Sequence, residues 1–282
     1  MKFPALLCSL LLVIPSSAMA QDSSPPPRPV RVAVINGMIM TGFWQALMER
    51  FTKETLIKVE LKAAGERPVL DEAFRKGGID FLTMHSGDIT TNLVTDGLAT
   101  GMRPWVSNEL VIAGPVSDPA GIKGMKDGVA ALKQIVERGG KFVDFRDIGS
   151  REVFHTVFTK SGLAPDPKWL VQDTAAEKRQ ILIFSGERNA YCTVGSLPIR
   201  TGRMPKKEMA TMVEGDPGMR RPFVLMTANP KRFPEANHAA AEALAEFLLK
   251  EETQKFIEGY GKGMNGDAPY FFPVAVEARG GR

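Results

Sequence analysis

Arginine, hydroxyl and amide side chains gather in four short loops of this sequence, and each loop follows a segment that reads as a strand. The loops are residues 36–41 (NGMIMT), 65–68 (GERP), 85–88 (HSGD) and 146–151 (RDIGSR). Groups of this kind bind anions. A guanidinium holds an oxyanion or a carboxylate through two hydrogen bonds, and the unpaired amides of a helix N-terminus add further donors. The four loops therefore predict a small-anion site.

The first two loops offer different donors. In the first, the Asn36 amide, the Thr41 hydroxyl and the backbone amides could contact a ligand, with Met38 beside them. The alternative is an ordinary turn in which Thr41 caps a helix. In the second, Arg67 would point toward the ligand if it lies at the start of the following helix, whereas a solvated surface arginine would have no role in binding.

The third loop is a weaker candidate than the fourth. It offers His85 and Ser86 as donors, but a lone histidine after a strand is usually a satisfied polar group. The fourth loop joins a strand to a helix with Gly149 and Ser150 at the turn, which is the arrangement that suits anion binding. The other candidates of this loop are Arg146, Asp147 and Arg151.

Catalytic signatures are missing from the sequence. The motifs G-x-S-x-G, H-E-x-x-H and C-x-x-C are absent, and His85, His155 and His238 show no metal-ligand spacing. A hydrolase using Cys192 or Ser150 is the alternative from another class, but no catalytic pair is identifiable. We expect Cys192 to be a small buried hydrophobe. We therefore predict a protein that is not an enzyme and that needs no cofactor or metal.

The loops need a sheet to position them, because ligands of open α/β folds bind where loops converge at the carboxyl ends of strands. Apolar runs of strand length alternate with helical spacing along the chain, which predicts an α/β fold with mostly parallel sheets. The predicted strands are residues 30–35, 57–61, 79–84, 110–113, 142–145, 189–194 and 223–226. The predicted helices are residues 43–51, 69–74, 128–137, 151–160 with a glycine cap at Gly162, 177–187 and 237–260.

A resemblance to a known family rests on four segments: residues 77–86 (GGIDFLTMHS), 105–126 (WVSNELVIAGPVSDPAGIKGMK), 213–234 (VEGDPGMRRPFVLMTANPKRFP) and 268–274 (APYFFPV). They resemble the periplasmic tungstate-binding proteins of ABC transporters, which have the type II periplasmic binding-protein fold. The resemblance runs from about Arg31 to Val274 and is most specific in scaffold segments. It implies two lobes joined by two crossing segments. Lobe I would comprise residues 30–113 and 222–282, and lobe II residues 114–221.

The resemblance also implies a function. The protein would be the periplasmic solute-binding component of an ABC transporter, closing its lobes around a small anion and presenting it to an inner-membrane permease. The alternative is a periplasmic sensor that presents the bound anion to a membrane receptor. In this family the fourth loop carries an Asp-Ser-Gly-Thr-like motif that grips the anion. Here Asp147, Gly149 and Ser150 match it, whereas Ile148 replaces the serine.

Two further departures from the family affect the ligand. The family's first loop is a run of threonine and serine, and a later Thr-Asp-Arg-like stretch supplies an arginine. The residues of this chain that correspond to that later stretch are Val194, Gly195 and Ser196, and they include no arginine. The candidate ligand contacts here are Thr193 and Ser196. Met38, Met40 and Ile148 instead predict a cleft with an apolar wall, while Arg67 and Arg151 would supply charge. This mixture suits an organic anion, such as a carboxylate, better than a bare oxyanion.

The N-terminal residues predict where the protein is located. Residues 1–20 fit a cleavable secretory signal, and residues 21–29 a flexible leader. No later segment approaches about 20 apolar residues, so we expect a periplasmic protein that is not embedded in a membrane. The net charge of +4 is spread along the chain without a basic face, which disfavours nucleic-acid binding. We expect a monomer.

Overall fold

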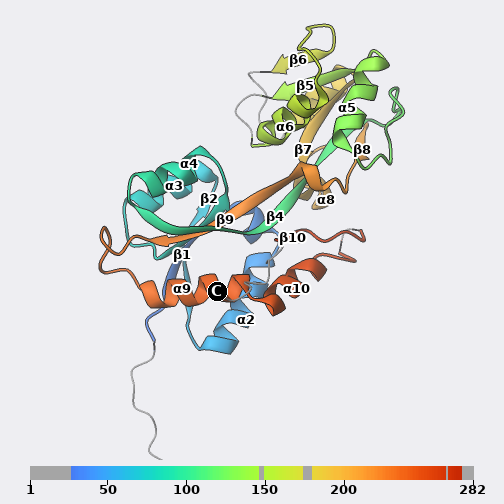
Figure 1. The fold of residues 1–282 in the computed structure, drawn as a ribbon. Helices are drawn as coiled ribbons and strands as arrows, with labels where there is room; N and C mark the ends of the chain where they lie inside the picture. Colours follow the sequence, from blue (N-terminus) through green and yellow to red (C-terminus); the bar gives the residue numbers. More distant parts are fainter. Residues whose placement is uncertain (1–26, 146–148, 174–179, 265, 275–282) are drawn as a thin grey trace, which may run out of the picture.

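Two lobes joined by long strands make up this computed structural model, which describes residues 27–145, 149–173, 180–264 and 266–274 (Figure 1). The predicted signal peptide and most of the predicted leader lie outside these ranges, as do Arg146, Asp147 and Ile148. Among the described residues, no helix combines the length and the apolar character that a bilayer span requires.

The first lobe places helices on both faces of a sheet. Figure 1 shows α3 and α4 above the strands β4 and β9, and α9 and α10 below them. Its strands are β1 (Val30–Ile35), β2 (Val59–Gly65), β3 (Phe81–His85), β10 (Phe272–Pro273) and parts of β4 (Ala99–Pro115) and β9 (Arg220–Ala228). Its helices are α1 (Asn36–Met40), α2 (Phe43–Thr55), α3 (Arg67–Arg75), α4 (Asp88–Thr95), α9 (His238–Leu249) and α10 (Glu251–Gly259).

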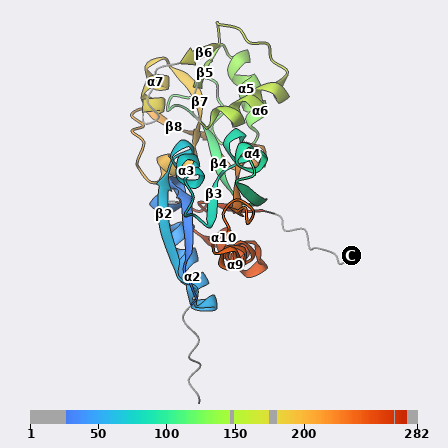
Figure 2. The same ribbon diagram turned by 90° about the vertical axis from the view of Figure 1, so that its left-hand side faces the viewer.

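The second lobe repeats this arrangement on a smaller scale, and the view in Figure 2 shows its strands standing above those of the first lobe. Its strands are β5 (Lys141–Phe145), β6 (Leu170–Asp173), β7 (Ala190–Gly195) and β8 (Met209–Val213). Its helices are α5 (Gly128–Glu137), α6 (Arg151–Ser161), α7 (Ile181–Glu187), α8 (Ser196–Arg200) and a 3₁₀ turn, η2 (Pro217–Met219).

The strand order β2-β1-β3-β9-β4-β7-β5-β6 explains how the lobes are joined. Strand β1 runs parallel to β2 and β3, and β5 runs parallel to β6 and β7. The central strands β9 and β4 are antiparallel to their neighbours. Strand β4 pairs with β9 from Ala99 to Glu109 and then with β7 from Leu110 to Ala113. Each lobe is therefore an α/β layer whose parallel strands flank the crossing strands, as the type II periplasmic binding-protein fold requires.

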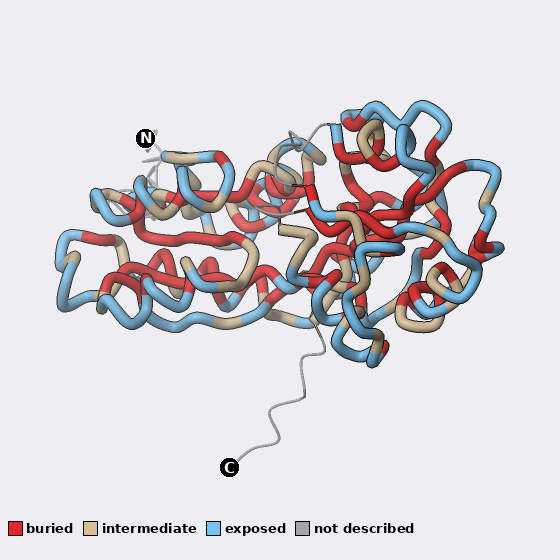
Figure 3. The backbone as a smooth tube through the Cα atoms, turned by 90° about the horizontal axis from the view of Figure 1, so that it is seen from above, coloured by how far each residue is buried: buried red, intermediate tan, exposed pale blue. Residues whose placement is uncertain are grey.

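Each lobe has hydrophobic cores of its own. In the first, the ring of Phe43 stacks on that of Phe271, with centroids 4.2 Å apart. In the second, alternate residues of β4 face opposite sides of the sheet: Leu110 and Ile112 belong to one cluster, and Val111 and Ala113 to another. Figure 3 shows the buried segments running through the middle of both lobes. Along β4, Val106 packs in the core of the first lobe and Leu110 in a core of the second. The predicted lobe boundaries stay a prediction.

Two predicted elements differ in kind from the structure, and a third lies partly outside the described residues. Residues 36–41 were expected to form a loop, yet they contain helix α1, whose C-terminus is capped by Thr41. The helix predicted for residues 237–260 is two helices, because Lys250 adopts an extended ψ of 152° that interrupts the hydrogen-bond ladder. Of the helix predicted for residues 177–187, the described part is α7, Ile181–Glu187.

Candidate functional site

A cavity of about 210 Å³ lies between the lobes. The first lobe contributes Ile35 and His85 to its lining, and the second contributes Gly149, Ser150 and Ile181. The crossing strands also contribute to the lining. Strand β4 supplies Asn108 and Leu110, and strand β9 supplies Arg221 and Phe223.

The period-two geometry of strands explains which crossing residues reach the cavity. Successive side chains of a strand point to opposite faces. Asn108 and Leu110 therefore share one face of β4, and Arg221 and Phe223 share one face of β9. Asn108 and Arg221 are also direct partners in the antiparallel register of the two strands. The sheet thus presents an amide and a guanidinium side by side where the lobes meet.

Both of these polar side chains are buried. Asn108 is 7% exposed and Arg221 is 6% exposed. The Asn108 Oδ1 atom has no hydrogen-bond partner among the described residues, and the same holds for the Arg221 Nη2 atom, although Nη2 lies 3.0 Å from a Glu152 oxygen. Buried polar atoms are nearly always hydrogen-bonded in native proteins. Their incomplete pairing therefore points to a ligand.

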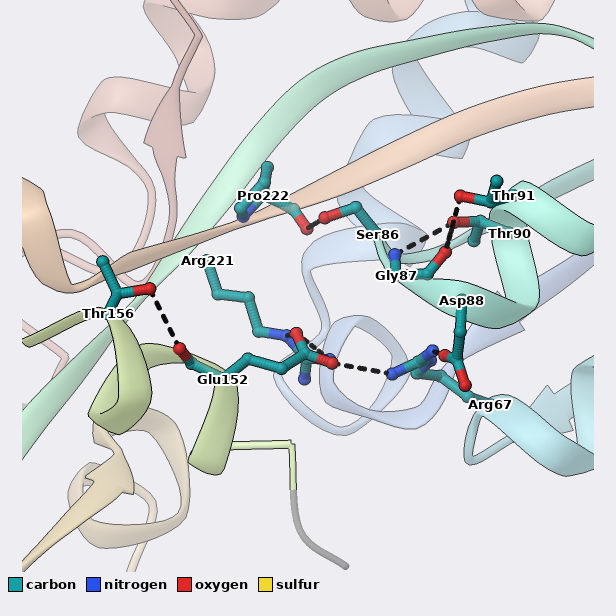
Figure 4. A network of polar contacts seen from close by, with 10 residues as sticks. All are labelled: Arg67, Ser86, Gly87, Asp88, Thr90, Thr91, Glu152, Thr156, Arg221 and Pro222. Carbon is teal, nitrogen blue, oxygen red and sulfur yellow. Dashed lines mark hydrogen bonds and ion pairs between the residues drawn. The ribbon is translucent and has the colours of Figure 1, made fainter. Parts of the chain in front are cut away.

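A carboxylate on the second lobe reaches both of the arginines near the cavity (Figure 4). Arg67 Nη1 donates to Glu152 Oε1 at 3.2 Å, and Arg221 Nε donates to Glu152 Oε2 at 3.1 Å. Arg67 also pairs with Asp88 of its own lobe. The Glu152 side chain is 50% exposed, whereas those of Arg67 and Arg221 are 15% and 8% exposed. Of Arg67, Glu152 and Arg221, Glu152 is thus the most accessible.

Local sequence signals place these three residues. Arg67 is the first residue of α3 and precedes a proline, which suits the first turn of a helix. This is the condition under which Arg67 was predicted to face the ligand. Glu152 lies in the first turn of α6, where the helix dipole favours a negative charge. Arg221 follows the 3₁₀ turn that leads into β9.

Burial is the main influence on the Arg221 guanidinium. Desolvation lowers the pKa of Arg221, the charge of Glu152 raises it, and the neighbouring charge of Arg67 lowers it. An arginine nevertheless stays protonated in proteins. The site therefore holds two close positive charges, and it needs negative charge beside them.

Several predicted ligand contacts lie at or beside the cavity. His85, Gly149 and Ser150 line it, and the His85 ring stacks on Phe223 with centroids 4.0 Å apart. Arg67 reaches the same region through Glu152. The loops after β1, β3, β5 and β7 all contribute to or adjoin this region, as the strand-end rule predicts.

The other predicted contacts have different surroundings. Met38 is buried in the first core, and Ser86 donates to the Pro222 carbonyl at 3.3 Å. Arg151 donates twice to the buried Asp144, at 3.0 and 3.2 Å. Asn36, Thr41, Thr193 and Ser196 do not line this cavity either. Arg146 and Asp147 lie outside the described residues. The ligand contacts predicted for these residues stay predictions.

Sequence reasoning missed Asn108, Glu152 and Arg221. It treated residues 105–126 and 213–234 as scaffold, although the alternation of Asn108 with Leu110 and of Arg221 with Phe223 places each pair on one strand face. That alternation was the available signal. The sequence places Glu152 in the first turn of a helix but gives no signal for its partners, which lie 85 and 69 positions away in the chain.

The groups described at this site offer charge and hydrogen bonds to a ligand. Among the described residues, no group of three or more histidine, cysteine, aspartate or glutamate side chains is arranged to hold a metal ion. The Cys192 thiol is fully buried, and burial raises its pKa to about 12. A thiol of this kind is inert as a nucleophile at neutral pH.

Comparisons with known proteins agree with this architecture. A protein of Haloferax volcanii, provisionally named an ABC transporter anion-binding protein, is 25% identical over 242 residues, which is 84% of this chain and 69% of the relative. The tungstate-binding protein TupA of Peptoclostridium acidaminophilum is 27% identical over 240 residues, 84% of this chain and 82% of the relative. The solved structure of TupA from Desulfovibrio alaskensis G20 matches with a TM-score of 0.71 and 24% identity, covering 88% of this chain and 99% of that one.

The family itself follows from a match that spans most of the chain. Residues 30–262 match the family described as bacterial extracellular solute-binding proteins. This family consists of binding proteins rather than enzymes, and its description places its members outside the cytoplasm. With its two lobes, its crossing strands and its interlobe cavity, the chain belongs to the bacterial extracellular solute-binding protein family.

Proposed function

We propose that this protein is the periplasmic solute-binding component of an ABC transporter and that it captures a small anion between its lobes. The observation that carries the proposal is the buried Arg221 guanidinium, which lines the interlobe cavity beside Asn108. A buried guanidinium whose Nη2 atom makes no hydrogen bond to the described residues, and only an ion pair with Glu152, favours an anionic ligand. The transporter role is supported by the provisional name of the Haloferax volcanii relative.

Hinge closure is the mechanism that the arrangement favours. The cavity has walls from both lobes, and the lobes are joined by β4 and β9. A ligand that contacts both walls interacts better with a closed form than with an open one, so it shifts the population toward closure. The closed protein would then dock on an inner-membrane permease.

A thermal-shift experiment on the chain without residues 1–20 tests the proposal. A ligand that binds only the folded state stabilises it by about 2.7 kcal/mol at a concentration of a hundred times its Kd, and this stabilisation raises the melting temperature. The panel should contain tungstate, molybdate, sulfate, phosphate and small carboxylates. We expect at least one class to stabilise the wild type and to lose its effect in Arg221→Gln.

Closure has its own readout. Small-angle X-ray scattering of the same chain should show a smaller radius of gyration when the stabilising anion is added. If no anion of the panel raises the melting temperature of a folded wild-type protein, the anion-binding proposal is wrong. Stabilisation that persists in Arg221→Gln would keep anion binding but would move it to another site.

A further inference from the structure

The two arginines beside the cavity already hold a carboxylate. Glu152 Oε1 accepts from Arg67 at 3.2 Å, and Glu152 Oε2 accepts from Arg221 at 3.1 Å. The carboxylate therefore uses one oxygen for each guanidinium. The carboxylate thus bridges the two arginines, and a charged donor makes each of these hydrogen bonds stronger than a neutral one. The spacing of these two arginines suits the two oxygens of one carboxylate.

Glu152 leaves this site only partly satisfied. The Nε atom of Arg67 and the Oδ1 atom of Asn108 have no hydrogen-bond partner among the described residues, and the Nη2 atom of Arg221 has only the ion pair with Glu152 at 3.0 Å. Glu152 is also half exposed, so its own carboxylate can return to water when another carboxylate takes over the two guanidinium groups. A second carboxylate that enters from the cavity side can take its place. The Asn108 amide can present either its oxygen or its NH₂ group to that ligand.

Charge balance limits what can enter. Arg67 and Arg221 are paired with Asp88 and Glu152, and Glu66, which lines the cavity, adds a further negative charge near Arg221. A ligand with one negative charge can replace Glu152 one for one and keep this balance. A dianion would bring an additional charge into a buried site, and a buried charge without a partner is unfavourable.

The rest of the wall is apolar. Leu110, Ile181, Val194, Leu197, Met204 and Phe223 line the same cavity. Ligand pockets of this composition bury an apolar body and use a few polar groups to fix its orientation. A small inorganic oxyanion has no apolar surface to bury against these side chains.

We propose that the ligand of this cavity is an organic monocarboxylate with an apolar body, and that its carboxylate takes the place of Glu152 between Arg67 and Arg221. This inference rests on the proposed function, because it names the class of anion that the same site binds. Glu152 then acts as an internal competitor: it neutralises the arginines when the cavity is empty and yields them to the ligand.

Isothermal titration calorimetry on the chain without residues 1–20 tests both parts. The probes are monocarboxylates from butanoate to 3-phenylpropanoate, the neutral amide 3-phenylpropanamide, tungstate and sulfate. We expect the monocarboxylates to bind, with affinity rising as the apolar body grows. The amide should bind at least about tenfold more weakly, because it cannot pair with two charged guanidinium groups. Tungstate and sulfate should neither bind nor compete.

The matched variants are Glu152→Gln and Glu137→Gln. Both remove one negative charge from a helix of the second lobe, but Glu137 is exposed at the end of α5 and does not line the cavity. Loss of an internal competitor should raise carboxylate affinity by about fivefold in Glu152→Gln, and Glu137→Gln should match the wild type. Arg221→Gln, checked by circular dichroism for a native fold, should lose binding.

Each contrary result has a distinct meaning. Binding of tungstate that depends on Arg221, without carboxylate binding, would overturn the ligand class and leave the proposed function standing. Carboxylate binding that is unchanged or weaker in Glu152→Gln would overturn the exchange with Glu152. Absence of binding by carboxylates and by every inorganic anion of the thermal-shift panel would remove the proposed function together with this inference.

Discussion

This protein contains two arginine–carboxylate arrangements that have the same residue types but differ in burial and in the source of their hydrogen-bond donors. In the first lobe, Asp80 is fully buried and accepts from the Arg31 backbone at 2.8 Å, from Arg31 Nε at 3.1 Å, from Arg31 Nη2 at 2.6 Å and from the Asn237 backbone at 2.9 Å. Between the lobes, Glu152 is half exposed, and among the described residues its carboxylate is held by the side chains of Arg67 and Arg221.

The difference lies in what supplies the donors. Two of the four donors to Asp80 are backbone amides, one on strand β1 and one at the N-cap of α9, so they cannot move without disturbing the fold. Burial by itself opposes ionisation of Asp80, but the hydrogen bonds from Arg31 and Asn237 outweigh it, and the pKa of Asp80 lies below its ordinary value. A pair fixed by backbone amides is structural, whereas one made only of side chains can exchange partners.

The largest effect should follow from breaking the first-lobe pair. Asp80→Asn keeps the shape but removes the charge that Arg31 needs, and removal of one partner from a buried pair costs about 3 kcal/mol. Urea unfolding followed by circular dichroism measures the loss. Glu60→Gln, in the exposed pair with Lys62, is the control and should change stability by less than about 0.5 kcal/mol. Equal losses in the two variants would contradict the structural role of Asp80.

Acid should weaken the same pair. The pKa of Asp80 is lower in the folded protein than its ordinary value, so its contribution to stability is present at neutral pH. That contribution is lost as the pH falls from about 4 through the folded pKa, by at most about 1.4 kcal/mol per pH unit. The unfolding free energy of the wild type, measured between pH 5 and pH 3, should therefore fall more steeply than that of Asp80→Asn. Parallel curves would show that other groups carry the acid sensitivity.

Local signals in the sequence predicted most elements of the fold. The helix predicted for residues 128–137 is α5, whose N-cap Asp127 accepts from the amides of Val129 and Ala130. The cap predicted at Gly162 is also confirmed, with a left-handed φ of 68°. Such features depend on a few adjacent residues. The break at Lys250 was missed because the apolar spacing continues across it into α10.

The site was less accessible to sequence reasoning. The loops after the strands could be placed, because carboxyl ends of parallel strands share an edge. Arg221, in contrast, lies inside a crossing strand, where a charged residue reads as one member of an alternating pattern. Its contact with Glu152 joins residues 69 positions apart, and no local periodicity encodes such a pair.

Breaking the interlobe arrangement should affect stability less than breaking the first-lobe pair. Glu152→Gln removes a half-exposed carboxylate, and pairs with an exposed partner are worth about 1 kcal/mol or less. We therefore expect a loss of about 1 kcal/mol in the ligand-free protein by urea unfolding, with Glu137→Gln unchanged within about 0.5 kcal/mol. A loss as large as that of Asp80→Asn would mean that Glu152 is a structural anchor, and the contrast between the two arrangements would disappear.

The smallest change in stability should come from Gly149→Ala, which separates the position of Arg221 from its charge. A Cβ atom at Gly149 would clash with Arg221 Nη1, so the guanidinium must move. The atom that must move ends a flexible side chain, and we expect the unfolding free energy to change by less than about 0.5 kcal/mol. Affinity for the stabilising anion should fall by about tenfold, because a displaced guanidinium loses its paired hydrogen bonds. Gly37→Ala adds a methyl group to the same cavity with no atom within 4 Å of it, so it should bind as the wild type does. If calorimetry shows the two alanine variants binding alike, then the position of Arg221 does not govern the site.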